Sequence, residues 1–321
     1  MRPVVSGGVI GSVLLLALGP TAMKVPAAGP LAPYIQTSDN GAYVDWLEGH
    51  VGVRGTATIS RKIAQNRVFY LQTKTAAEIQ GHERMLSLID GIARDGRTLL
   101  SADAQVRTKI GERVKNQQAE EIVRDKGPVF EVVVKTPLWG PDSLMQVVLG
   151  EPGPPRIPPG VTTAGVPAIP AQIGEGPTGL IVDARGLESP AAALLPRILD
   201  EAGRLVHGVD SADPSSIRER GLVAYAVSPY GVDPLSAGFR QGDRPMMVKA
   251  VSSTGSTHAD LIIRQADADR VAALGEAPAF LKECRVIVLM NPPPPQKPHT
   301  APGLRTAPRR VGPRPEDPNL H

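Results

Sequence analysis

The hydrophobic and polar positions near the start of the chain predict two short β-strands, over residues 42–46 and 50–58, around the turn 47–49, where Gly49 supplies the turn. The apolar positions then recur at steps of three, four and seven or eight, which predicts a long helix from residue 59 to about residue 93. The apolar stripe of this helix consists of Ala64, Val68, Leu71, Ile79, Leu86 and Ile89.

The rest of the first half mixes the two periods. A second helix is predicted near residues 104–114, and strands are predicted near residues 120–124 and 129–134. Asp142 or Ser143 can then cap a short helix, because a side-chain oxygen at that position accepts from the first free backbone N–H groups.

The second half is predicted to contain six or seven short strands and two or three short helices. The strands are expected at residues 179–184, 197–200, 204–207, 222–227, 245–251, 260–264 and 284–290, and the main helices at residues 211–219 and 266–274. Strands and helices do not alternate regularly as βαβ units in either half. The predicted fold class is therefore α+β, with two small mixed domains.

Proline and glycine mark the boundaries of these domains. Residues 151–177 contain eight Pro and five Gly, which favours an extended, semi-stiff linker. Residues 291–321 are rich in Pro and poor in core-forming residues, which predicts a disordered basic tail. We therefore expect one domain over residues 36–150 and a second over residues 178–290.

The amino terminus has the pattern of a secretory signal peptide. Arg2 precedes the apolar run 9–18, and Val25-Pro26-Ala27 offers small residues before a cut at Ala28. Ten apolar residues are too few to cross a bilayer as a helix, which favours a cleaved signal over residues 1–27. A retained anchor over residues 4–23 is the alternative. The protein is expected in the periplasm or outside the cell, without a transmembrane segment after signal removal.

Charge and composition exclude some classes of partner. The net charge is +3, but the leader carries +2 and the tail carries +3, so residues 28–290 carry −2. The body is therefore not a basic nucleic-acid surface, and no nucleic-acid partner is predicted. Aromatic residues make up only 3% of the chain, which argues against stacking platforms for sugars or single-stranded nucleic acid.

The cysteine and histidine positions predict no metal or cofactor site. Cys284 is the only cysteine, so no intramolecular disulfide can form. Its strand pattern places it on one face with Val286 and Val288, as a buried small residue. His82 falls on the helical stripe with no second His, Cys or paired acid at ligand spacing, so it is interpreted as a core residue.

Two segments match known functional motifs but lack the structural surroundings that those motifs need. Residues 174–179 satisfy GxGxxG, but dinucleotide sites need this turn between a strand and a helix, whereas here it leaves a linker and enters a strand. Residues 252–260 place Ser, His and Asp close together. Triads are assembled from distant segments, so a hydroxyl-rich turn between two strands is favoured. A catalytic loop is the alternative.

One location is the candidate for ligand binding. Asp183 and Arg185 end an apolar strand, and His207 ends another. Together these polar residues could bind an anion, while Asp183 and Arg185 could equally form a structural charge-assisted pair. No catalytic residue is predicted.

Several segments resemble known bacterial families. Tyr43-Val44-Asp45-Trp46, Gly49, Val53 and Gly55, with the long helix and the strand 129–134, resemble the membrane-associated lipoproteins of the Lpp-twenty family and the related amino-terminal domain of flagellar assembly protein T. Residues 178–187, 197–201, 245–250 and 280–288 resemble a carboxy-terminal region of secreted, uncharacterised bacterial proteins. The resemblance implies an envelope protein with no catalytic site to transfer. The lipid-bearing Cys of the lipoproteins is missing here.

These observations favour an exported, non-enzymatic envelope protein that binds or scaffolds another envelope component. The expected partner is a cell-envelope protein or assembly, such as an outer-membrane or flagellar basal component. An envelope hydrolase that uses the loop 252–260 is the alternative. A third hypothesis is that the tail docks as a basic, proline-rich peptide on an acidic polymer or a partner domain.

Overall fold

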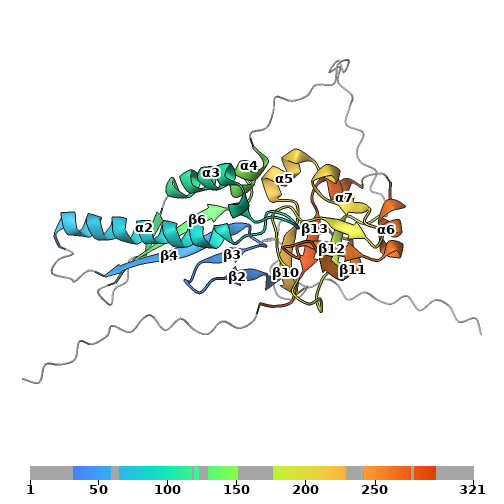
Figure 1. Cartoon of the computed structure of the whole chain (residues 1–321), viewed down its shortest axis with the longest axis horizontal. Helices are drawn as coiled ribbons and strands as arrows, with labels where there is room; N and C mark the ends of the chain where they lie inside the picture. The colour runs from blue at the N-terminus through green and yellow to red at the C-terminus, as the bar shows by residue number, and fades with distance from the viewer. Residues whose placement is uncertain are drawn as a thin grey trace, which may run out of the picture.

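The computed structural model describes residues 32–58, 65–117, 119–122, 129–150, 176–228, 240, 242–275 and 278–293. They form two β-sheets that lie side by side, each accompanied by helices (Figure 1). The predicted signal peptide, linker residues 151–175 and the tail beyond residue 293 lie outside the described residues. The predicted α+β class is confirmed.

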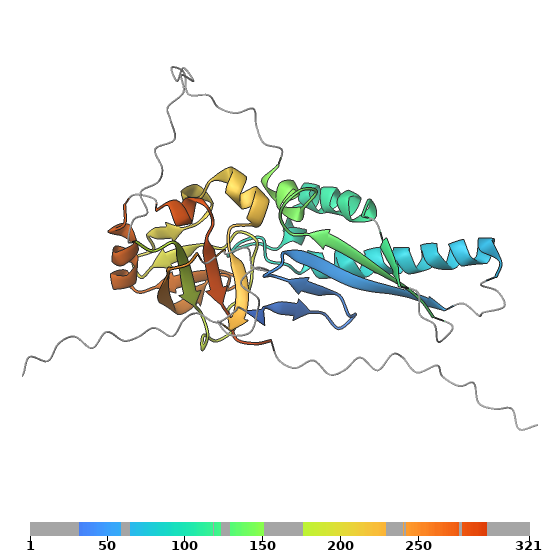
Figure 2. The ribbon, with the colours of Figure 1, turned by 180° about the vertical axis from the view of Figure 1, so that it is seen from behind.

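The first sheet has five antiparallel strands in the order β2-β3-β4-β6-β5. Their bounds are Ile35–Thr37 for β2, Tyr43–Asp45 for β3, His50–Thr58 for β4, Val129–Pro137 for β6 and Ala119–Ile122 for β5. Helix α2 (Arg67–Asp90) packs on β4 and β6, with α3 (Ala104–Lys115) beside it. The opposite face carries no helix among the described residues (Figure 2). This one-sided cover is common in antiparallel sheets.

Glycines allow α2 to approach the sheet closely. A Cβ atom on Gly55 of β4 would lie 2.0 Å from the backbone oxygen of Ala77, so only glycine fits there. Gly81, one turn further along α2, also lies against Gly55. The helix begins after Asn66, whose side chain accepts from the backbone N–H of Val68.

The apolar stripe predicted for this helix is largely wrong. Val68, Leu71 and Ile79 are 61%, 49% and 53% exposed, and Ala64 lies outside the described residues. The buried side consists of Ala77, Gly81, Met85, Leu88 and Ile89. The close contact with Gly55 sets the rotation of the helix, and it requires small residues rather than the large ones counted in the sequence. In the described part of the chain, neither α2 nor another helix combines the length and hydrophobicity needed to cross a membrane.

The second sheet has eight strands in the order β1-β10-β13-β7-β11-β12-β8-β9. Their bounds are Ala32–Pro33, Ala224–Ser228, Val286–Leu289, Gly179–Asp183, Pro245–Thr254, Asp260–Ile263, Ile198–Asp200 and Leu205–His207 in that order. The helices of this half are α5 (Pro214–Arg220), α6 (Gln265–Ala272) and α7 (Ala279–Lys282). Short 3-10 turns, η1 (Leu100–Ala102) and η2 (Val209–Ser211), and helix α4 (Leu144–Leu149) complete the described elements.

The inner strands of this sheet are parallel. β10, β13, β7 and the first half of β11 run in one direction, and β12 runs parallel to β8. All four residues of β13 are buried, as expected for a parallel strand covered on both faces. The shared face predicted for this segment is confirmed, because Cys284, Val286 and Val288 pack in one cluster of buried side chains, whereas Ile287 and Leu289 pack in another. The strand itself begins later than predicted, at Val286. Cys284 precedes β13, in a turn with φ 55°, although it is buried as expected.

The hydrophobic core does not divide at the predicted linker. A single cluster of buried side chains runs from Val51 and Met85 in the first half to Tyr225 and Val288 in the second. Trp46 meets Tyr225 edge to face, with ring centroids 5.3 Å apart. β1 precedes the first sheet in sequence but pairs with β10 of the second. The two sheets therefore share a core along one seam.

Candidate functional site

Asp183 and Arg185 form an ion pair at the end of β7. Nε and Nη2 of Arg185 each donate to an Asp183 carboxylate oxygen at 2.8 Å, and the Arg185 backbone N–H donates at 3.1 Å. The Arg185 guanidinium lowers the pKa of the Asp183 carboxyl. Two of the three candidate ligand-binding residues are thus brought together, and they bond to each other.

His207 lies elsewhere in the sheet. Strands β8, β12 and β11 separate its strand, β9, from β7. The His207 ring is fully buried, with Nε2 3.3 Å from the Leu222 carbonyl oxygen and Nδ1 3.4 Å from the Ser211 hydroxyl. Burial lowers the pKa of His207 to about 4. The structure therefore does not join His207 to Asp183 and Arg185. The sequence could not show this, because it does not reveal the order of the strands in the sheet.

The hydroxyl-rich segment between β11 and β12 contacts the loop that follows α2. Ser256 donates to the Arg97 carbonyl oxygen at 2.6 Å, and Thr257 donates to the Asp95 carbonyl oxygen at 2.7 Å. A Cβ atom on Gly255 would lie 1.9 Å from the Gly96 carbonyl oxygen, so the two loops meet backbone to backbone. These hydroxyls therefore join the sheets.

Asp260 also lies at this contact between the two loops. Its carboxylate is completely buried and accepts from the backbone N–H of Arg197 at 2.8 Å and from Nε and Nη2 at 3.0 and 2.6 Å. A Cβ atom on Gly96 would lie 2.0 Å from this carboxylate. Among the described residues, no hydrogen bond joins the side chains of Asp260 and His258. The acid thus orients an arginine and no histidine base.

A second contact between the two halves of the chain involves Trp139, which was not among the predicted site residues. Its indole ring fills the space where Cβ atoms on Gly49 and Gly221 would lie, at 2.2 and 2.6 Å from the nearest ring atoms. The guanidinium carbon of Arg240 sits 5.3 Å from the ring centroid. Only the rarity of tryptophan, with two in the chain, could have pointed to this residue.

Arg240 is buried without a carboxylate partner among the described residues. Its guanidinium donates to the backbone carbonyls of Arg220 and Gly221, where α5 ends. Burial lowers the pKa of Arg240 to about 10, so the side chain is still charged at neutral pH. The negative end of the helix dipole and the Trp139 ring replace the missing acid.

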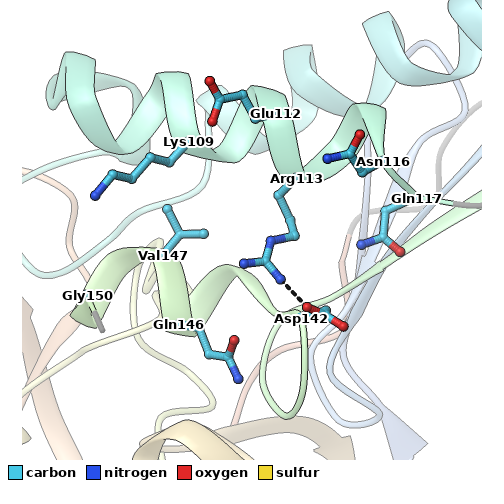
Figure 3. A pocket seen from close by; sticks show the side chains of 9 residues that line it. All are labelled: Lys109, Glu112, Arg113, Asn116, Gln117, Asp142, Gln146, Val147 and Gly150. Carbon is cyan, nitrogen blue, oxygen red and sulfur yellow. Dashed lines mark hydrogen bonds and ion pairs between the residues drawn. The ribbon is translucent and has the colours of Figure 1, made fainter. Parts of the chain in front are cut away.

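A polar groove of about 750 Å³ lies between α3 and α4 (Figure 3). Lys109 and Arg113 of α3 bring two positive charges to it, and Glu112 and Asp142 bring two negative charges. Arg113 Nη1 donates to the Asp142 carboxylate at 2.5 Å, which spans the groove from α3 to the loop before α4. Figure 3 shows Arg113 reaching from α3 to Asp142 on the loop before α4, with Gln146 and Val147 on α4.

Side-chain amides supply the rest of the polar lining. Asn116, Gln117 and Gln146 line the groove, and Gln146 Nε2 donates to the Gly140 carbonyl oxygen at 3.2 Å. Amides beside balanced charges offer both donors and acceptors, which suits a polar ligand such as a peptide segment. The sequence pattern did not predict this groove. The only sequence signal near it was the cap before α4, where the Ser143 side chain accepts from the Gln146 backbone N–H.

The described residues contain no group of three or more His, Cys, Asp or Glu side chains placed to hold a metal ion. Cys284 is also poorly suited to nucleophilic chemistry, because burial raises the pKa of its thiol to about 11.

The second half of the chain is similar to a bacterial domain. Residues 179–292 match the family model for the second domain of Treponema pallidum Tp0624. The match runs from the start of β7 to just beyond β13, and it agrees with the expected resemblance of this half to a region of bacterial proteins. It does not cover the first half, so the resemblance to Lpp-twenty lipoproteins and flagellar assembly protein T has no support from it. No curated protein matches the chain.

Proposed function

We propose that this protein is an exported bacterial envelope protein that binds or scaffolds another envelope component without catalysing a reaction. The observation that carries the proposal is the groove between α3 and α4, where opposite charges and amides of the two helices and their flanking loops lie close together. Such a surface recognises a polar partner by hydrogen bonds and paired charges. We assign a peptide segment of an envelope protein to this groove, because none of the described residues that line it is an aromatic platform for a sugar.

The rigidity of the body supports a binding role. Trp139 and Arg240 lock the loop before α4 against α5, and Arg218 Nη2 donates to the Gly150 carbonyl oxygen at the end of α4 at 3.3 Å. The groove is therefore held by contacts with the second sheet as well as by the first. A preformed surface of this kind loses little conformational entropy when a partner binds.

The envelope location rests on the leader pattern over residues 1–27, which predicts export. The similarity of the second half to a domain of Treponema pallidum Tp0624 supports a bacterial protein. The resemblance of the first half to envelope lipoproteins and a flagellar assembly domain belongs to this proposal. On this basis the protein lies in the periplasm or outside the cell, and its partner is an outer-membrane or flagellar basal component.

The hydrolase alternative has weaker support. Ser256, Thr257 and Asp260, which would have to act in that loop, are engaged in bonds that hold the two sheets together. A nucleophile needs a base within hydrogen-bond reach, and the described side chains provide none for these hydroxyls. We therefore do not propose catalysis at this loop.

Photo-crosslinking in cells tests the proposal. A photoreactive amino acid placed at Lys109, inside the groove, should give one dominant adduct with an envelope protein in the periplasmic or membrane fraction. The matched control carries the same amino acid at Arg107, which lies on the opposite side of α3 and pairs with Asp90. Equal adducts from both positions would contradict the groove assignment. Full-length protein recovered from the cytosol with its leader uncut would contradict export.

A further inference from the structure

A cavity at the seam between the sheets is independent of the groove. This cavity, called the seam pocket below, has a volume of about 360 Å³ and lies between the loop 94–98 after α2 and the strands β8 and β9 with their flanking residues. Both halves of the chain contribute its walls. Its volume is within the range of small-molecule sites.

The wall contributed by the first half is held in a fixed shape. The Asp95 carboxylate accepts from the backbone N–H groups of Arg97 and Thr98, both at 2.9 Å, which closes the loop on itself. Ser256 and Thr257 then bind the backbone of the same loop from the second sheet. The seam pocket is therefore formed before a ligand arrives.

Three arginines line the seam pocket. Arg94 Nε donates to Asp95 at 3.0 Å, and Arg197 is aligned by the buried Asp260 through Nε and Nη2. Within the described part of the chain, Nη1 of Arg197 and the whole guanidinium of Arg97 make no hydrogen bond or ion pair. Guanidinium groups with unused donors bind carboxylates through paired hydrogen bonds.

Apolar side chains form another part of the lining. Leu205 and Val209 remain 36% and 40% exposed, and Leu195 lies beside them in the same pocket. Large aliphatic side chains with this exposure would gain from contact with an apolar ligand group. Asp210 also lines the seam pocket, and its negative charge would repel a second anionic group on the ligand.

We propose that the seam pocket binds a monocarboxylate that carries an apolar group. The carboxylate pairs with Arg97 and with the unused edge of Arg197, while the apolar group covers Leu205 and Val209. Two sources share this chemistry, a free aliphatic acid and the carboxy terminus of a peptide that ends in an aliphatic residue.

Titration calorimetry on the full chain tests the proposal with sodium octanoate as the probe. Octanoate should bind with 1:1 stoichiometry, and octanedioate, which has the same length and a second carboxylate, should bind at least tenfold more weakly. The Arg97→Gln variant should lose at least tenfold in affinity, because glutamine has no guanidinium to pair with the carboxylate. The variant should still fold, since the exposed Arg97 side chain makes no hydrogen bond or ion pair within the described residues. Arg107→Gln, an exposed arginine outside the seam pocket, should bind as the unaltered protein does.

N-acetylglycyl-leucine and its carboxy-terminal amide distinguish the two sources. A free peptide acid that binds more tightly than octanoate supports a peptide terminus, and the reverse order supports a free acid. The proposal is overturned if octanoate shows no heat of binding at millimolar concentration, if Arg97→Gln binds it unchanged, or if the peptide amide binds as well as the acid. None of these results bears on the crosslinking at Lys109, so the two sites fail separately.

Discussion

The two halves of the chain differ in how far their polar side chains remain open to a partner. In the eight-stranded sheet the inner strands are buried, and the buried polar side chains Asp200, His207 and Asp260 all bond to neighbouring protein groups. In the described part of the chain one face of the five-stranded sheet carries no helix, and α3 with the residues after it brings charges and amides to an open groove. The comparison indicates that the second sheet keeps its buried polar groups bonded within the fold, whereas the first half also presents charged and amide groups to an open groove.

The largest expected effect comes from removing a charge in the second half. Arg197→Met keeps the aliphatic stem but leaves the fully buried Asp260 carboxylate without its guanidinium. Loss of one partner of a buried ion pair is strongly destabilising, and we expect the free energy of unfolding to fall by about 3 kcal/mol. This is the lower end of the usual range, since the Arg197 side chain is 39% exposed.

Urea denaturation at pH 7.5 measures this loss, with Arg107→Met as the control. Arg107 pairs with Asp90 at 2.7 Å, but its side chain is 60% exposed, so the control should lose far less stability than Arg197→Met. Similar losses in the two variants would break the contrast between buried and available polar groups.

The second effect is a loss of stability in mild acid through His207. Its ordinary pKa of 6.5 applies to the unfolded chain, and burial lowers the pKa to about 4 in the folded state. Above pH 6.5 both states are neutral, and the full stability is present. As the pH falls from 6.5 to 4, only the unfolded state gains the proton, so stability decreases by up to about 3 kcal/mol.

Denaturation curves between pH 7.5 and 4.5 test this, with His207→Gln as the comparison. The pKa values of His50 and His82 are also lowered by burial, so part of the pH dependence should persist in the variant. The slope of stability against pH should nevertheless be clearly smaller than in the unaltered protein. An identical slope would show that His207 does not titrate in this window.

The smallest effect concerns how closely α2 packs on the first sheet. Gly55→Ala forces a methyl group against the Ala77 carbonyl of α2, so α2 must move, and stability should fall by about 2 kcal/mol. Gly111→Ala in α3 meets open space and should gain up to about 1 kcal/mol, because alanine is the better helix former. Thermal unfolding of both variants gives the two signs. A stabilised Gly55→Ala protein would contradict the close approach of α2 to β4.

Local patterns in the sequence located most of the elements. The strands 50–58 and 129–137 and the helix 104–115 lie close to where the periodicity predicted them, since a period of two or 3.6 is set by neighbouring residues. The rotation of α2 could not be predicted, because it depends on Gly55, in a different strand. The parallel order of the second sheet was missed for the same reason, as it depends on which distant segments pair.

The site residues show the same limit more strongly. Asp183 and Arg185 are two positions apart, and their pairing was among the expected outcomes. Trp139 and Arg240 meet from segments far apart in sequence, and His207 bonds to Leu222 on the far side of α5. Charge and hydropathy patterns contain no information about those contacts. The groove and the seam pocket likewise depend on how loops such as 94–98 meet another element.

The pairing of β1 with β10 has a consequence for how the polypeptide could be taken apart. Strand β1, which precedes every strand of the first sheet in sequence, pairs with β10 of the second sheet. Apolar side chains from both halves also pack together in one buried cluster. A protease cut between residues 150 and 176 would therefore release no free half. The two fragments would stay associated as a nicked complex. Either fragment produced alone would expose a hydrophobic surface and tend to aggregate.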